Sequence, residues 1–294
     1  MKNKNFLIKN GDGSEIKFAI SKFPAGEVGL SLDPIYKTSK DVVIECDIYD
    51  ANDVLILEAM ILNIKNIVHI KVGFMAFQRQ DKYKIINNGK LEEIPLYSSP
   101  LKIIDRAIGS RKITVSLLDM HNNLSDDFFE YQLNIIPDVE KIVDYGLKAL
   151  LDRDIAASPD DVVLVYPDAG ALSRYSKTNV NYKSVHFSKK RGDDGRIYEH
   201  KLDESYDDDV FVGKDVFVID DLCDGGATFI SISQKIKGAK TKTLYVTHGL
   251  FTNGTAYLKM SYDLIMYSTS PFLENDRTLE DCLKIEFNED KENE

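Results

Sequence analysis

The segment from Asp215 to Ile230, DVFVIDDLCDGGATFI, is the closest grouping of residues in this chain that could do chemistry. An apolar run typical of a buried strand leads into the adjacent acids Asp220 and Asp221, and a helical pattern begins after a loop of small residues. That loop consists of Asp224, Gly225, Gly226, Ala227 and Thr228. Small residues let backbone N–H groups approach an anion closely, and the start of a helix adds partial positive charge. The pattern favours a phosphate-binding loop beside two acids that accept hydrogen bonds from sugar hydroxyls, directly or through a metal. The alternative is an acidic turn whose glycines only reverse the chain.

Three further positions carry candidate chemistry. The basic run Lys189-Lys190-Arg191 precedes a polar stretch, 192–195, that suits a closing flap. A lysine supplies a compact charge and an arginine a planar fork, and both suit phosphate oxygens; the alternative is a solvated basic run at the end of a strand. His121 and Asp168 each follow a strand-like run and are candidates for metal or triphosphate binding, or else for structural roles in turns.

These residues lie in a chain whose periodic signals alternate between strands and helices. Helical patterns cover 53–65, 139–151 and 229–237, and strand-like runs cover 41–46, 68–74, 114–118, 162–166, 184–188, 216–219, 243–247 and 264–267. Several runs are apolar without alternation, which suits parallel strands covered on both faces. The sequence therefore predicts an α/β fold with parallel sheets. Ile136-Pro137-Asp138 is the expected boundary between two domains, 1–138 and 139–294.

Composition narrows the class of protein. The 294 residues are 43% hydrophobic and 29% charged, as in ordinary globular domains. The net charge of −11 disfavours a nucleic-acid partner. The most apolar stretch, 59–77, is interrupted by Lys65 and Lys71, so no membrane partner is expected. Three scattered cysteines (Cys46, Cys223 and Cys282) favour a reducing, cytoplasmic setting.

The segment from Asp215 to Ile230 resembles the phosphoribosyl-diphosphate (PRPP) motif of type I phosphoribosyltransferases and, more closely, that of ribose-phosphate diphosphokinases (PRPP synthetases). Seven more segments resemble the latter family in order. They are FPAGE at 23–27 (the adenine loop F-S-D-G-E), Asn52-Asp53 (N-D-N-L), FQRQD at 77–81 (Y-A-R-Q-D), LDMH at 118–121 (D-L-H), YPDAG at 166–170 (S-P-D-x-G), KKR at 189–191 (K-R-R), and THGLF at 247–251 with Gly254 (T-H-x-x-F-S-G).

The resemblance implies two phosphoribosyltransferase-like domains, each with a mainly parallel sheet flanked by helices, and a catalytic cleft between them. It implies transfer of the β,γ-diphosphate of ATP to the 1-hydroxyl of ribose 5-phosphate, with Mg²⁺ as cofactor. It also implies a homo-oligomer whose ATP site includes a loop from the neighbouring subunit. The implied catalytic residues are Lys189 and Arg191, and the metal residues are His121 and Asp168, on opposing domain edges. The implied ATP-binding residues are Phe23, Glu27, Arg79, Gln80, Asp81 and His121; the loop 224–228 and the acids Asp220 and Asp221 would bind the sugar phosphate.

Departures from the family pattern leave alternatives open. Gly225 stands where the family loop usually has threonine, so a hydroxyl donor is lost and space beside the loop is expected to open. That change makes ADP-ribose a second acceptor, as in phage-type enzymes that rebuild NAD in the host cytoplasm. Ala25 replaces an aspartate of the adenine loop, and the strand-like run 283–287 stands where the family has a helix. Phe23 has the alternative of packing in the core. Two other functions remain open: a phosphoribosyltransferase, and a catalytically silent subunit that associates with a diphosphokinase.

Overall fold

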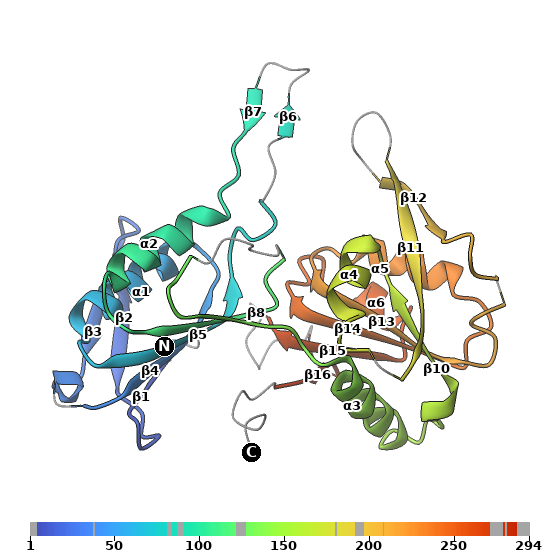
Figure 1. The fold of residues 1–294 in the computed structure, drawn as a ribbon, viewed down its shortest axis with the longest axis horizontal. Coiled ribbons are helices and arrows are strands. Elements are labelled where there is room, and N and C mark those ends of the chain that lie inside the picture. The colour runs from blue at the N-terminus through green and yellow to red at the C-terminus, as the bar shows by residue number, and fades with distance from the viewer. Residues whose placement is uncertain are drawn as a thin grey trace. The chain divides into compact units, whose positions relative to one another are not determined.

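The computed structural model describes residues 5–37, 39–80, 84–86, 91–121, 128–179, 181–191, 197–207, 209–270, 279 and 281–286. At 84–86, 91–93, 190–191 and 197–199 this description covers the backbone alone. The contacts within the chain divide it into two compact units, Met1–Ile135 and Ile136–Glu294 (Figure 1).

The first unit is built on a five-stranded sheet with the order β1-β4-β5-β8-β9. Its strands are β1 (Phe6–Lys9), β4 (Val42–Ile48), β5 (Ile67–Met75), β8 (Thr114–Leu118) and β9 (Gln132–Ile135). Only β1 runs antiparallel to its neighbour in this sheet. The helices α1 (Ala51–Asn63) and α2 (Ser98–Ile108) pack against each other (Figure 1). A 3-10 turn (Pro34–Lys37) and two hairpins, β2 (Phe18–Lys22) with β3 (Val28–Leu32) and β6 (Lys84–Ile86) with β7 (Leu91–Glu93), complete the described part of this unit.

The second unit is built on a seven-stranded sheet with the order β12-β11-β10-β13-β14-β15-β16. Its strands are β10 (Val162–Tyr166), β11 (Lys183–Arg191), β12 (Ile197–Leu202), β13 (Asp215–Cys223), β14 (Thr241–Gly249), β15 (Leu264–Thr269) and β16 (Leu283–Lys284). Only β12 is antiparallel to its neighbour. The described helical segments are α3 (Val139–Leu151), α4 (Ala169–Tyr175), α5 (Ala227–Lys235), α6 (Ala256–Lys259) and a 3-10 turn (Pro159–Asp161).

The central strands of the second unit are buried on both faces, which explains their unbroken apolar sequences. One core contains α3 and α4 residues packed on Leu164 and Phe217. The other contains α5 and α6 residues packed on Val165 and Val218. Every residue of β10 is buried, as parallel strands with helices on both faces require. The carboxyl ends of β10, β13 and β14 therefore share one edge of the sheet, where α/β folds place ligands.

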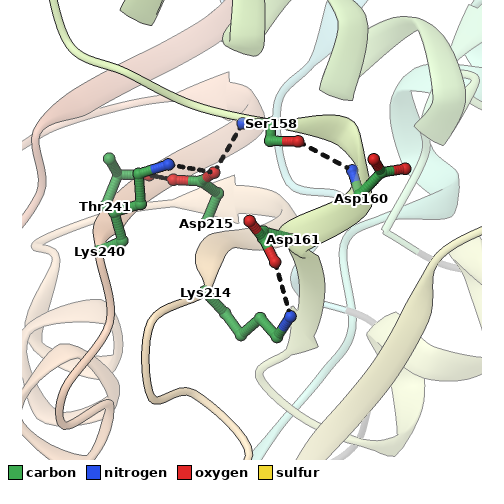
Figure 2. A network of polar contacts seen from close by, with 7 residues as sticks. All are labelled: Ser158, Asp160, Asp161, Lys214, Asp215, Lys240 and Thr241. Atoms are coloured by element: carbon green, nitrogen blue, oxygen red, sulfur yellow. Dashed lines mark hydrogen bonds and ion pairs between the residues drawn. The ribbon is translucent and has the colours of Figure 1, made fainter.

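The opposite edge of this sheet is held by a polar network around Asp215, the first residue of β13 (Figure 2). The fully buried Asp215 carboxylate accepts hydrogen bonds of 2.8 Å from the Ser158 backbone N–H and 2.8 Å from the Thr241 hydroxyl. The Lys240 ammonium lies 3.7 Å from it, so the buried charge is paired. The network joins the starts of β13 and β14 to the turn before β10.

The predicted α/β class with mainly parallel sheets is confirmed, and β8, β10 and α3 have the predicted bounds. Helix α1 begins two residues before its predicted start because Asp50 and Asp53 form a capping box. Helices α2 and α4 and strand β12 were not predicted from the sequence. Within the residues that are described, no helix is both long enough and apolar enough to cross a membrane.

Candidate active site

The predicted phosphate loop connects β13 to α5. Gly226 precedes the helix with a φ of 84°, a left-handed conformation that glycine adopts without strain. No side chain among the described residues caps the first turn of α5, so its backbone N–H groups are available to an anion. The segment after β14 supports the loop: the Thr252 hydroxyl donates to the Asp224 carboxylate at 2.7 Å, and the Leu250 N–H donates to the Cys223 carbonyl at 2.8 Å.

Gly225 does not open space beside this loop, so that part of the sequence-based expectation is wrong. A Cβ atom at Gly225 would lie 2.7 Å from Nδ2 of Asn253, closer than real Cβ contacts. The Asn253 amide donates to the Gly225 carbonyl at 3.2 Å. The side chain of Asn253 therefore fills the space that a larger residue at 225 would need. The loss of the threonine hydroxyl stands as expected from the sequence.

The two predicted sugar-binding acids have different surroundings. Asp221 is 4% exposed, and its carboxylate lies 3.7 Å from the guanidinium of Arg174 on α4, whose side chain is 10% exposed. Asp220 keeps some exposure and accepts the Asp221 N–H at 3.0 Å. Burial, followed by the charges of Asp221 and Asp168, raises the pKa of Asp220 well above its usual range, and Lys189 opposes that shift. Of the two acids, Asp220 is the one with surface that a ligand can reach.

Asp168 and Lys189 meet at the same edge of the sheet. Asp168 follows β10 and caps α4 by accepting the Ala171 N–H at 2.9 Å, and it forms a short ion pair with the ammonium of Lys189 on β11. Burial opposes ionisation of Asp168. The hydrogen bond and charge of Lys189, with backbone N–H groups, outweigh it, so the pKa of this carboxyl lies below its usual value. Arg191 ends β11, but its side chain lies outside the described part of the structure, as do residues 192–196.

The predicted adenine loop forms the tip of the β2–β3 hairpin in the first unit. The Phe23 N–H donates to the Glu27 carbonyl at 2.8 Å, and Gly26 turns the chain with a φ of 92°. Phe23 is 52% exposed, so the alternative that it packs in the core is wrong. Its ring lies beside Gly29, where a Cβ atom would be 3.2 Å from it. Glu27 is exposed as well.

The remaining predicted ATP residues follow β5 and β8, which are neighbouring parallel strands. Arg79 is exposed, Gln80 is half-buried, and Asp81 lies outside the described residues. His121 is half-buried, and its backbone N–H donates to the side chain of Gln78 at 2.8 Å. Asn52 and Asp53 lie in the first turn of α1, where the Asp53 carboxylate accepts the Asp50 N–H at 3.4 Å in the capping box and also the Tyr49 N–H at 2.9 Å.

Comparisons with known proteins identify relatives of this chain. Ribose-phosphate pyrophosphokinase from Pyrococcus furiosus is 25% identical over 246 residues, covering 80% of this chain and 78% of that protein. The enzyme of the same name from Pyrococcus abyssi is 24% identical over 253 residues, covering 82% of this chain and 79% of that protein. The chain is a homologue of the ribose-phosphate pyrophosphokinases. No protein-family model matches the sequence.

A solved structure supports the pyrophosphokinase relationship at the level of the fold. The crystal structure of phosphoribosylpyrophosphate synthetase from Mycobacterium smegmatis matches 90% of this chain and 85% of its own chain with a TM-score of 0.65 at 17% identity. This structure confirms the fold, and the curated relatives confirm the family resemblance predicted from the sequence and an enzyme of the pyrophosphokinase type. The individual site residues stay predictions.

In this pyrophosphokinase homologue the structure groups some predicted residues and adds others. The second unit brings Asp168, Lys189 and Asp220 within range of one another's charges. Arg174 was not predicted, because it reaches Asp221 only in the fold, 47 residues along the chain from it. Sequence reasoning also missed His200, which pairs with Lys189 across β11 and β12, is 5% exposed, and contacts the Ser231 hydroxyl of α5 at 3.1 Å. Burial and then the charge of Lys189 lower the pKa of His200, so we expect a neutral ring at pH 7.

Proposed function

We propose that this chain transfers the β,γ-diphosphate of ATP to the 1-hydroxyl of ribose 5-phosphate, giving PRPP and AMP. The observation that carries the proposal is the cluster of Asp168, Lys189 and Asp220 at the sheet edge that also presents the loop 224–228. The curated relatives, which are named for the same chemistry, support it over most of the chain.

The second unit is proposed to bind the sugar. The N–H groups at the start of α5 would hold the 5-phosphate, with Thr228 beside them, while Asp220 would accept hydrogen bonds from the ribose hydroxyls. Asp221, buried against Arg174, would act by fixing the end of β13.

In the transfer the sugar O1 forms a bond to the β-phosphorus, and the bond from that phosphorus to the α,β-bridging oxygen breaks. Lys189 and Arg191 would stabilise the charge that develops on the transferred phosphates.

The first unit is proposed to bind ATP. Arg79, Gln80, Asp81 and His121 follow strands whose carboxyl ends share one sheet edge. Phe23 and Glu27 are exposed on a hairpin tip, a position suited to reaching the nucleotide of a neighbouring subunit. We propose a homo-oligomer with shared ATP sites on this basis.

Magnesium fits the donors of the second unit only in part. No group of three metal-ligating side chains occurs among the residues that the structure describes. Magnesium in phosphoryl-transfer sites is usually held by one or two carboxylates together with substrate phosphates and water. Asp168 and Asp220 can supply those carboxylates, and His121 is proposed to meet the triphosphate. The ion would neutralise phosphate charge during the transfer.

The direct test is incubation with ATP and each sugar, followed by phosphorus NMR. We expect AMP and PRPP to form only when ATP and ribose 5-phosphate are both present, and Lys189→Met to abolish the products. PRPP consumption with a nucleobase and no use of ATP would instead identify a phosphoribosyltransferase. Stable association with another diphosphokinase and no turnover alone would identify a silent subunit.

ADP-ribose is the second acceptor to compare. The loss of the hydroxyl at Gly225 supports it, because a terminal phosphate monoester needs more donors than a phosphate diester. Open space beside Gly225 does not support it, since Asn253 occupies that space. Diphosphorylation of ADP-ribose in preference to ribose 5-phosphate would also favour the phage-type branch and an NAD-rebuilding pathway.

A further inference from the structure

Gln78 links the ends of two neighbouring strands in the first unit. It lies three residues after β5 and is 2% exposed. Its Oε1 accepts the backbone N–H of His121, 43 residues away and three residues after β8, at 2.8 Å. Because the donor is a backbone N–H, the atom facing it must be the side-chain oxygen, which fixes the orientation of the amide. Gln78 thus holds the backbone at the histidine predicted to meet the triphosphate.

The backbone on each side of this link has an unusual conformation. Phe77 has a φ of 69° and Asp119 a φ of 44°, both in the left-handed region that non-glycine residues adopt only at a cost. Each is tied to its surroundings: the Gln80 N–H donates to the Phe77 carbonyl at 2.8 Å, and the Asp119 N–H donates to the Ile135 carbonyl at 2.7 Å. The two chain segments turn sharply just where the Gln78 side chain joins them.

The other half of the Gln78 amide is unsatisfied. Nε2 is buried and has no hydrogen-bond partner among the described residues. A buried donor without a partner is costly, so an apolar side chain would serve better if the position had only to fill space. The family segment Y-A-R-Q-D that 77–81 resembles has alanine at this position, so the amide is not a requirement of the turn itself.

We propose that Gln78 is a positioning residue for His121. Its carbonyl oxygen fixes the main chain at 121, so that the imidazole is held where the triphosphate of ATP binds. This inference rests on the proposed function, because it assumes that His121 meets ATP. Gln78 acts through the histidine and does not contact the nucleotide, since its free nitrogen is enclosed by protein.

The test compares variants at both ends of the same strand. Gln78→Met keeps the length of the side chain and removes the acceptor, whereas Gln78→Glu keeps an oxygen within reach of the His121 N–H. Asn66→Ala is the matched control, because the Asn66 amide donates to the Ser39 carbonyl at 2.6 Å just before β5 begins. Each variant is examined for amide hydrogen exchange at His121, ATP affinity by calorimetry, the kcat and KM for ATP, and thermal unfolding.

For Gln78→Met we expect about tenfold faster exchange at His121 and a loss of about tenfold in ATP affinity or in kcat, the size of one lost hydrogen bond. The thermal midpoint should stay near that of the wild type, because the unpaired amide is removed with the bond. Gln78→Glu should recover at least half of the lost affinity or turnover on a logarithmic scale, and Asn66→Ala should change neither.

Faster exchange at His121 with wild-type ATP affinity and turnover would overturn the proposal, as would unchanged exchange. If the wild type binds ATP but makes no PRPP, the proposed reaction fails, while ATP affinity still decides the role of Gln78.

Discussion

Replacing Lys189 by methionine removes the cation of the cluster while keeping most of the side-chain volume. In the structure Lys189 pairs with Asp168 and its charge also acts on Asp220, so the substitution has two separable effects. The first concerns catalysis. Loss of one charged group that stabilises a transition state typically costs about 3–4 kcal/mol, or about 10²–10³ in kcat. We therefore expect kcat to fall by at least about a hundredfold, while ATP affinity falls by less than about tenfold.

The second effect of Lys189→Met concerns pH. In the wild type the folded-state pKa of Asp168 is depressed, so its contribution to stability is present above the ordinary carboxyl pKa and is lost as pH falls through the depressed value. Without Lys189, the hydrogen bond and the charge that lower this pKa are lost while burial, which raises it, remains, so the folded-state pKa of Asp168 rises. The stability that the ionised carboxyl contributes at neutral pH therefore shrinks. The difference in thermal midpoint between wild type and variant, measured without ATP or magnesium, should widen as pH rises from below the ordinary carboxyl pKa of about 4 to neutrality.

Two results would refute this reasoning about Lys189. Equal losses in kcat and in ATP affinity would show that the lysine binds the ground state and the transition state alike. A difference in thermal midpoint that does not change with pH would show that the ion pair with Asp168 does not set the pKa of that carboxyl. Lys183→Met, at the start of the same strand, is the control for loss of a lysine from β11.

Three further predictions concern the second unit. Gly225→Thr should raise the preference for ribose 5-phosphate over ADP-ribose by about tenfold, the worth of one hydrogen bond to a charged group. The full change is expected only when Asn253→Ala is added, because a Cβ at position 225 would lie 2.7 Å from Nδ2 of Asn253. If the double variant keeps the wild-type ratio of kcat/KM for the two sugars, the missing hydroxyl at Gly225 does not set the acceptor preference. Arg174→Met should remove the positive charge that faces the buried Asp221 and lower the free energy of unfolding by about 3 kcal/mol, measured by urea titration. Adding Asp221→Asn should recover most of that loss. Asp215→Ala should cost about 3 kcal/mol by the same measurement because it leaves buried donors unpaired, while kcat at the opposite sheet edge stays within about twofold.

Local sequence was enough for the elements whose signal is continuous. The unbroken apolar run 162–166 and the helical period of 139–151 gave their bounds directly. Strand β12 was missed because its side of the hairpin mixes charged and apolar residues, and its strand character comes from pairing with β11. Helix α4 was not predicted because seven residues are too few for a helical period, and its start depends on capping by Asp168.

The candidate site was predicted where its residues adjoin in sequence and missed where they meet only in the fold. The loop 224–228 was found because strand, acids, glycines and helix follow one another. Asn253 contacts Gly225 across 28 residues of sequence, and His121 contacts Gln78 across 43. Neither contact can be predicted from the sequence of one segment alone. The error about open space at Gly225 has this origin, since a missing side chain leaves a void only if no distant residue occupies it.

The charges of the candidate site explain why it would need help to accept phosphate. Its described acids are Asp168, Asp220, Asp221 and the loop residue Asp224, and its described bases are Arg174 and Lys189, a formal sum of −2 if all are ionised. Lys189 is already paired with one acid and Arg174 with another, so neither offers its full charge to a ligand. A chain of net charge −11 adds no general attraction for a polyanion. Binding must then rely on the N–H groups of α5 and on a cation that arrives with the substrate. If Asp168 were to hold such a cation, its carboxylate would give up its pairing with Lys189. The ammonium of Lys189 would then be free to meet the phosphates, so occupation of the site would supply the positive charge that the site alone lacks.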